Sequence, residues 1–400
     1  MSETALLAVL LAGIAGLLAG RVWERGARRA DARHRGAFHT SPHYLQGLHY
    51  LAAGQLELAI SELTKVTRED PSALEVRLVL GNLLRESGQV ERAIQVHQAL
   101  LGRDDLARAE RTHALACLGL DYRAAGFLDR ASRTFQEVLQ ADPRNLHALG
   151  GVQRLHEEQR EWREASEIRT RLSRMRKSDD SLVLGHLQAK LGEEAAEAGL
   201  RDAAERAFRT AISLDRGVFP AHLGLAALLA PTDPAQAAAQ LEEAIDLVPE
   251  RAYLALAPLS AAYAECGEPS RFVALCERLI QRDPRDWRAR LALARHLRDQ
   301  SRPEEAYGLL LRAVEANPQV LIIHLEAWRT LARMGVRGEP IDRYIATAEH
   351  AVFYRDPHIC TACRYRADDM LWRCPHCHEW NTLVEERLDP IPVRSVTGVA

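Results

Sequence analysis

A repeat of about 34 residues constrains this 400-residue chain more than any other feature. The clearest unit carries Gly119, Tyr122, Gly126, Ala131 and Pro143, and the same residue types return with similar spacing before and after it. Small residues suit the contact between two antiparallel helices, and glycine suits the turn between them. Proline ends the second helix because the residue before it avoids the α conformation. One such pair cannot bury its apolar face alone, so the pattern predicts a stacked array of helix pairs.

The array is expected to span residues 40–352 and to contain about eight or nine helix pairs. The fourth unit lacks the glycines but keeps Ala165, and the seventh has Phe272 where a small residue is expected. A ninth, degenerate pair is expected from Val320 to His350. The G-x-x-Y, Ala and Phe positions and the closing proline resemble the tetratricopeptide repeat family. This resemblance implies an all-α superhelix.

Arrays of that family bind peptides or proteins in a concave groove lined by the first helix of each pair. In this register, Asn82, Arg85 and Arg123 face the groove and are candidate partner-binding residues; the alternative is that they are ordinary solvated side chains. In related arrays, a clamp of Lys, Asn and Arg holds the tail of a chaperone. The matching positions here hold Tyr44, Leu48, His113 and Cys117. Binding of a chaperone tail is therefore not predicted.

An uncharged run, Ala5–Gly20, stands near the start of the chain and is extended past Arg21 by Val22 and Trp23. Its length suits a short membrane span. A cleaved signal peptide is the alternative, but the residues before the run contain Glu3 and no basic residue. Arginines follow the run, and the positive-inside rule then places the bulk of the chain in the cytoplasm. We expect a single-pass anchor at residues 1–23 and a basic juxtamembrane linker at 24–39.

The overall composition argues against several classes of function. A net charge of −3, from 52 basic and 55 acidic residues, gives no general positive field for nucleic acid. The chain has no phosphate-binding loop, no HExxH motif and no recognisable pairing of a nucleophile with a base, so it is not expected to be an enzyme. Cys117, Cys266 and Cys276 lie in apolar helical patterns and are expected to be buried free thiols.

Two Cys-x-x-Cys pairs close the chain, in the stretch "CTACRYRADDMLWRCPHC". Their spacing predicts a structural site in a small domain at residues 353–388, followed by a tail at 389–400. Four thiolates fill a tetrahedral shell, and both zinc and iron accept that ligand set. We expect one iron or zinc ion bound by four residues: Cys360, Cys363, Cys374 and Cys377. A redox dithiol is the alternative, while His376 and His378 are expected to lie outside the ligand set.

The same stretch resembles rubredoxin in its C-x-x-C-x-Y and C-P-x-C elements. It departs from rubredoxin at Arg364 and His378, where that family has glycine. If these positions need a positive φ, each side chain adds about 1 kcal/mol of strain. Trp372 and Trp380 bracket the second pair and are expected to pack the ribbon against the last repeats.

An anchor, a repeat array and a rubredoxin-like ribbon in this order resemble the lipopolysaccharide assembly protein B family. The resemblance implies a non-catalytic adaptor at the cell inner membrane. It would promote proteolysis of the lipid A pathway deacetylase (LpxC) by the membrane protease FtsH, and would coordinate other lipopolysaccharide assembly proteins. A homodimer is left open. The alternatives are a generic membrane-anchored scaffold for another complex and a rubredoxin-like electron carrier.

Overall fold

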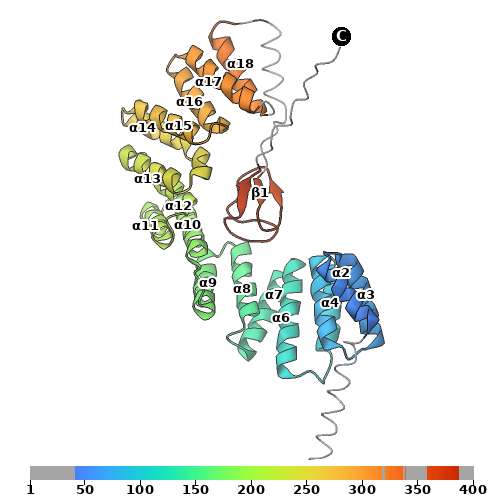
Figure 1. Ribbon diagram of the computed structural model, residues 1–400. Coiled ribbons are helices and arrows are strands. Elements are labelled where there is room, and N and C mark those ends of the chain that lie inside the picture. The colour runs from blue at the N-terminus through green and yellow to red at the C-terminus, as the bar shows by residue number, and fades with distance from the viewer. Residues whose placement is uncertain (1–40, 318–319, 337, 339–357, 387–400) are drawn as a thin grey trace, which may run out of the picture. The chain divides into compact units, whose positions relative to one another are not determined.

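The computed structural model describes residues 41–317, 320–336, 338 and 358–386 (Figure 1). The chain divides into two compact units, Met1–Leu172 and Ser173–Ala400. The expected anchor at 1–23, the linker at 24–39 and the tail at 389–400 lie outside the described residues. Within the described ranges, no helix is both long enough and apolar enough to cross a bilayer.

Unit 1 is built from antiparallel helix pairs in chain order. Its helices are α2 (Pro42–Ala52), α3 (Leu56–Glu69), α4 (Leu74–Glu86), α5 (Val90–Leu101), α6 (Arg108–Ala124), α7 (Leu128–Ala141), α8 (Leu146–Glu158) and α9 (Trp162–Arg176), the last of which runs past the unit boundary. Helices α3 and α7 end two residues before Pro71 and Pro143, as the repeat pattern predicts.

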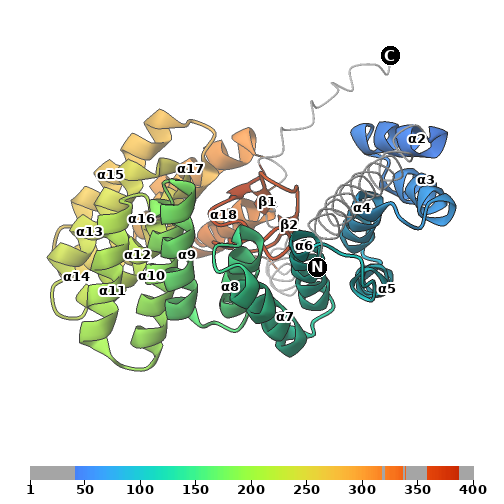
Figure 2. The same cartoon turned by 90° about the horizontal axis from the view of Figure 1, so that it is seen from below.

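Unit 2 continues the array and adds the ribbon. Its helices are α10 (Ser181–Glu197), α11 (Arg201–Leu214), α12 (Phe219–Leu229), α13 (Pro234–Leu247), the 3-10 helix η2 (Pro249–Leu254), α14 (Leu256–Glu265), α15 (Pro269–Arg282), α16 (Trp287–Asp299), α17 (Pro303–Ala316) and α18 (Leu321–Arg333). Helices α10 to α13 lie side by side in Figure 2. The described helices agree in number and order with the eight expected pairs and are followed by α18; the rest of the expected ninth pair lies outside the described residues.

The glycines of the repeat lie at the helix contacts and in the turns, as their spacing predicts. A Cβ added to Gly119 would lie 2.6 Å from Phe135, so the bare glycine lets α6 and α7 approach closely. Gly126 turns the chain between these helices at a φ of 77°. Where the glycine is missing from this turn position, Arg160 and Ser301 take a positive φ instead. Phe272 is fully buried in the core of unit 2 despite replacing a small residue.

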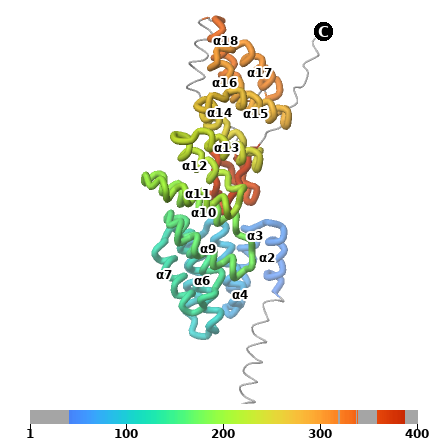
Figure 3. Tube along the Cα trace, turned by 90° about the vertical axis from the view of Figure 1, so that its left-hand side faces the viewer, coloured from blue at the N-terminus to red at the C-terminus, as the bar shows by residue number. Residues whose placement is uncertain are grey.

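The ribbon is a three-stranded antiparallel sheet in the order β2–β1–β3. Its strands are β1 (His358–Cys360), β2 (Arg366–Ala367) and β3 (Leu383–Glu385). The core of this small domain consists of Cys360, Cys374 and Leu383, all fully buried. Figure 3 shows the ribbon in red beside the helices of unit 2. So few apolar residues give the ribbon little core of its own.

Candidate metal centre

Each Cys-x-x-Cys pair forms a tight turn that aims both thiols inward. The N–H of Arg364 donates to the carbonyl of Cys360 at 2.9 Å, and the N–H of His378 donates to that of Cys374 at 3.0 Å. Arg364 and His378 have φ values of 65° and 61°. Both positions therefore have the positive φ considered in the sequence analysis. A residue other than glycine adds about 1 kcal/mol of backbone strain at each of them. That strain is retained because the surrounding turns hold the backbone in place.

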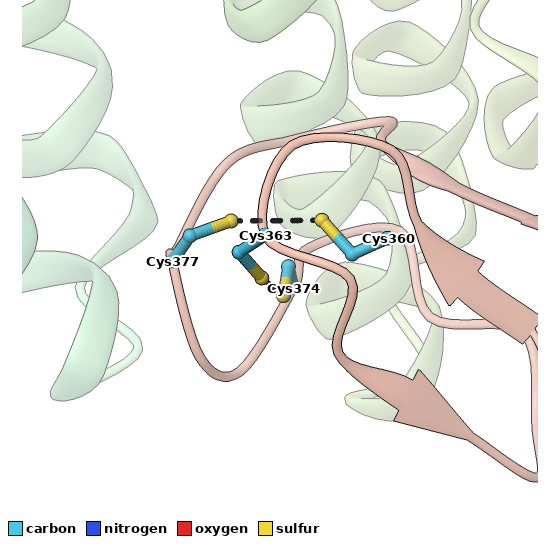
Figure 4. A group of neighbouring side chains, drawn as sticks. All are labelled: Cys360, Cys363, Cys374 and Cys377. Carbon is cyan, nitrogen blue, oxygen red and sulfur yellow. Dashed lines mark hydrogen bonds between the residues drawn. The ribbon is translucent and has the colours of Figure 1, made fainter. Parts of the chain in front are cut away.

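The two turns bring four sulfurs together (Figure 4). The Sγ atoms of Cys360 and Cys377 lie 3.7 Å apart, and those of Cys363 and Cys374 lie 3.6 Å apart. All four sulfurs lie within 4.8 Å of one another. A regular tetrahedron with metal–sulfur bonds of about 2.3 Å has edges of about 3.8 Å, so the observed spacing fits a tetrathiolate site. The four cysteines can hold one metal ion.

The thiols of the cluster differ in the direction in which their surroundings shift the pKa. Burial opposes the charge of Cys360, but hydrogen bonds from Thr382 and from the backbone of Cys363 outweigh it and lower the pKa of Cys360 to about 6. Burial and the neighbouring thiols raise the pKa of Cys363, and they raise that of Cys377 to about 12. Four thiolates repel one another at this distance unless a cation lies between them.

The histidines beside the last cysteine stay outside the cluster. Among the described residues, the group close enough to hold a metal consists of the four cysteines. His376 is exposed and stacks on Tyr365, with ring centroids 6.2 Å apart. That His376 and His378 are not ligands stays a prediction.

The aromatic residues around the second cysteine pair fix the ribbon to the array. The ring of His186, from α10, lies 5.8 Å from that of Trp372 and 5.5 Å from that of Trp380. Trp372 also stacks on Phe219 of α12 at 6.3 Å and carries Arg251 of η2 over its face at 5.0 Å. The tryptophans therefore pack on α10, α12 and η2. The expectation that they pack on the last repeats is wrong, because the aromatic partners lie earlier in the chain.

Polar contacts surround this aromatic stack. Arg251 donates to the side-chain oxygen of Asn381, and the hydroxyl of Tyr253 is hydrogen-bonded to Nε2 of His358 at 2.9 Å. Arg288 of α16 pairs with Glu385 of β3. The sequence analysis missed these array residues. Arg251 and Tyr253 lie in the 3-10 helix η2, and no motif of the sequence marks them.

The environment of His186 keeps its ring neutral. Burial, followed by the nearby charges of Arg251 and Lys190, lowers the pKa of His186 to about 4. A neutral ring can lie between two indoles at little cost, whereas a buried imidazolium would be strongly disfavoured.

The candidate partner-binding residues are engaged within unit 1. Arg85 donates to Asn82 at 2.9 Å and to Asp121 of α6 at 2.7 Å. Arg123 donates to Glu158 of α8 at 2.6 Å. The structure thus brings Asn82 and Arg85 together and places Arg123 in a separate pair. Both arginines tie one first helix to the next.

A buried polar cluster that the sequence analysis missed lies beside these pairs. Nδ1 of His97 lies 2.5 Å from Oδ2 of Asp121, and both side chains are fully buried. Burial disfavours the charged form of His97. Its hydrogen bonds and charge interactions with Asp121 and then Cys117 outweigh burial and raise the pKa of His97 to about 9. Burial likewise opposes the thiolate of Cys117, but His113 and His97 lower its pKa to about 6.

The three remaining cysteines differ in their surroundings. Cys117 and Cys276 are buried and free, as expected, while Cys266 is only half-buried. Burial and nearby carboxylates raise the pKa of Cys276 to about 12, which is typical of an inert thiol. Cys117 differs because its neighbours are imidazoles.

Known proteins match both parts of the chain. A model described as the rubredoxin metal binding domain matches residues 358–385, and a tetratricopeptide repeat model matches residues 44–108 and 273–320. YrrB, whose crystal structure is described as that of a TPR protein with an unusual peptide-binding site, is 21% identical. Its match covers 48% of this chain and 95% of its own with a TM-score of 0.35, which is too low to support an inference.

Two relatives match most of the chain. Lipopolysaccharide assembly protein B of Escherichia coli (strain K12) is 24% identical over 381 residues, covering 94% of this chain and 96% of its own. The protein of the same name from Haemophilus influenzae is 24% identical over 353 residues, covering 85% and 88%. The chain is thus similar over most of its length to proteins named lipopolysaccharide assembly protein B, and it joins segments that match tetratricopeptide repeats to one that matches a rubredoxin metal binding domain.

Proposed function

We propose that this protein is a non-catalytic adaptor of the inner membrane that regulates lipopolysaccharide synthesis. In this proposal, residues 1–23 form the anchor and the array faces the cytoplasm. The adaptor brings the lipid A pathway deacetylase to an FtsH-type membrane protease and so limits the lifetime of the deacetylase. It also gathers other lipopolysaccharide assembly proteins. Its homology to proteins named for lipopolysaccharide assembly supports this role.

The observation that carries the proposal is that the ribbon, with its cysteine cluster, packs directly on helices of the array. Trp372 lies two residues before Cys374, and Trp380 lies three residues after Cys377. The rings of both tryptophans pack on His186. A structural metal, iron or zinc, would hold these two loops in place, because four thiolate ligands leave no open position for chemistry. An array with a fixed ribbon offers a preformed surface to a folded client.

In this proposal the membrane anchor holds the client-binding surface close to the protease. An adaptor anchored in the same membrane as the protease raises the effective concentration of a bound client near it. No new catalytic group is needed, since the protease supplies the chemistry.

The lifetime of the deacetylase tests this role. Translation would be stopped in cells with and without the protein, and the deacetylase followed by immunoblotting. Depletion is expected to lengthen its half-life several-fold. Wild type should restore the short half-life and Cys374→Ser should not, while Cys266→Ser, outside the ribbon, serves as the control. An unchanged half-life on depletion would contradict the adaptor role and leave a scaffold for other partners.

A further inference from the structure

Aromatic rings bridge successive repeats of the array. Phe135 of α7 lies between Gly119 of α6 and Gly151 of α8, and a Cβ on either glycine would collide with its ring. The same contact recurs in unit 2 among three residues: Phe208, Gly192 and Gly224. An apolar ring against bare glycines is therefore the ordinary filling of this place in the repeat, because it needs no polar partner.

A histidine holds this place in the second helix pair. His97 of α5 follows the buried Ala93, and its ring packs on Gly81 of α4. Phe135 follows the buried Ala131 at the same interval. The side chain of His97 is fully buried. Burial of an imidazole is costly unless its nitrogens find partners, so the neighbours of this ring indicate its role.

A thiol takes the place of the glycine opposite the ring. Cys117 of α6 precedes the buried Ala131 of the next helix, and Gly151 of α8 precedes the buried Ala165 at the same interval. Hydrogen-bonding and charge interactions between His97 and Cys117 shift the pKa of both groups, which agrees with this contact. The second pair thus sets a sulfur against an imidazole where other repeats set nothing against a phenyl ring.

A buried carboxylate orients the imidazole. Nδ1 of His97 lies 2.5 Å from Oδ2 of Asp121, and Arg85 of α4 donates to Oδ1 of the same carboxylate at 2.7 Å. Among the described residues, Nε2 of His97 has no hydrogen-bond partner of normal geometry, so this nitrogen is left for the sulfur. A thiol, an imidazole and a carboxylate in this order can hold a thiolate and supply a proton beside it.

The neighbours of the thiol and of the ring set their charges. Burial disfavours the thiolate of Cys117, but His113 and then His97 outweigh burial and lower the pKa of Cys117 to about 6. Burial also disfavours the charged ring of His97, but Asp121 and then Cys117 raise its pKa to about 9. At pH 7 the pair is therefore a thiolate beside an imidazolium, and the thiolate is the nucleophilic form of cysteine.

The position of Cys117 limits what can reach it. Cys117 is 5% exposed, whereas His113, one turn earlier on α6, is exposed and interacts with the same thiol. The sulfur thus lies at the border between the core and the surface. A reagent little larger than water can approach it, and a peptide or a bulky disulfide cannot.

We propose that Cys117 is a peroxide-reactive thiolate and that His97, oriented by Asp121, supplies the proton for its reaction. The thiolate attacks one oxygen of hydrogen peroxide, and the O–O bond breaks as the S–O bond forms. The departing hydroxide takes the proton of Nε2 of His97 and leaves as water. The sulfur is oxidised by two electrons to a sulfenic acid, and the peroxide is reduced. This site goes beyond the adaptor role and does not depend on it.

Oxidation of the full-length protein, purified in detergent with its metal, tests the proposal. Hydrogen peroxide is added at pH 7 and removed with catalase after set times. The protein is then denatured with dimedone, which traps sulfenic acid, and N-ethylmaleimide, which caps the remaining thiols. Mass spectrometry resolves the three array thiols because each lies in its own tryptic peptide: Cys117, Cys266 and Cys276.

The other two thiols are internal controls. Cys117 should be oxidised several-fold faster than Cys266, although Cys266 is half-buried and therefore the more exposed of the two. Cys276, whose pKa is raised to about 12, should stay reduced. Oxidation of Cys117 no faster than that of Cys266 would overturn the proposal.

His97→Phe gives a matched variant, because Phe135 and Phe208 occupy the equivalent place in other repeats. The variant should keep the helical content of the wild type by circular dichroism. Its Cys117 should react at least about tenfold more slowly, while the rate at Cys266 stays unchanged. An unchanged rate at Cys117 in the folded variant would overturn the role of His97.

The pH dependence of the wild type decides the matter if that variant does not fold. The rate at Cys117 should stay nearly constant between pH 7 and pH 8, because the thiolate is already formed and His97 is still protonated. An ordinary thiol would react about tenfold faster at the higher pH. Such a rise at Cys117 would overturn the proposal. These measurements need neither protease nor deacetylase, so their failure would leave the adaptor role untouched.

Discussion

His186 of α10 and Trp380 of the ribbon stack with their ring centroids 5.5 Å apart and their planes 27° from parallel. His186 lies near the start of unit 2 and Trp380 near its end. Trp380 follows Cys377, a predicted metal ligand, by three residues. Trp380 is only 8% exposed, so its ring is committed to this interface. The stack couples the position of the ribbon to the charge state of one imidazole.

Acid should weaken this docking through His186. The pKa of His186 is lowered to about 4 when its ring is buried, whereas a free imidazole titrates near 6.5. Its contribution to stability is therefore complete above pH 6.5 and is lost as the pH falls toward 4. By pH 5 the loss would be about 2 kcal/mol. Tryptophan fluorescence during urea unfolding at pH 7 and pH 5 measures it.

His186→Phe is the matched control, because it keeps an aromatic ring and cannot titrate. Both proteins share any acid effect on the metal cluster, so only the difference between them reports on His186. The wild type should lose more stability than His186→Phe between pH 7 and pH 5. Equal losses would show that the imidazole does not govern the docking.

The ion pair between Arg288 and Glu385 should matter more than the exposed pairs of the array. The side chain of Glu385 is 8% exposed, and removal of Arg288 would leave that buried carboxylate without its main counter-charge. Arg288→Ala should therefore cost about 3 kcal/mol. Arg278→Ala removes a pair with Asp246 that is largely in solvent and should cost less than about 1 kcal/mol. Chemical denaturation of both variants provides the comparison, and similar costs would argue against a buried pair.

The repeat seam can be tested with two glycines of the array. A Cβ at Gly119 would lie 2.6 Å from the ring of Phe135, whereas one at Gly150 would meet nothing within 4 Å. Gly119→Ala should destabilise unit 1 by about 1–3 kcal/mol through overpacking. Gly150→Ala lies inside α8 and should stabilise it by up to about 1 kcal/mol. Thermal unfolding of the two variants would show opposite shifts, and shifts of the same sign would contradict the packing.

Metal content gives a direct test of the cysteine cluster. Wild-type protein should contain about one iron or zinc ion per chain by elemental analysis, and Cys374→Ser should lose most of it. Because the ribbon has little core of its own, the same variant should also expose Trp372 and Trp380 to an added quencher. Cys266→Ser should behave as wild type. Full metal content in Cys374→Ser would exclude this cysteine as a ligand.

The parts of the fold with a local sequence signal were predictable. The spacing of Gly119, Gly126 and Ala131 reflects the contact and the turn of one helix pair, so it can be read from a single segment. The two cysteine pairs were predictable for the same reason, since each turn is local. The fourth and eighth pairs form without a glycine in their turns because Arg160 and Ser301 accept a positive φ there.

The tryptophans of the ribbon were expected to dock it on the array, but the array side of this contact was not predictable, because it joins residues far apart in the chain. His186 looks like any residue of a repeat helix, and only its position opposite Trp372 and Trp380 gives it a role. The buried pair of His97 and Asp121 was missed for a similar reason. His97 packs against Gly81 as Phe135 packs against Gly119, so an expected apolar position holds an imidazole.

Reconstituted proteolysis tests the adaptor role most directly. Membrane-embedded FtsH-type protease and purified lipid A deacetylase would be combined with ATP, with or without this protein in the same bilayer, and the loss of deacetylase followed over time. The wild-type protein should accelerate degradation several-fold, and Cys374→Ser should give little acceleration. Degradation at the same rate with and without the wild-type protein would contradict the proposed function.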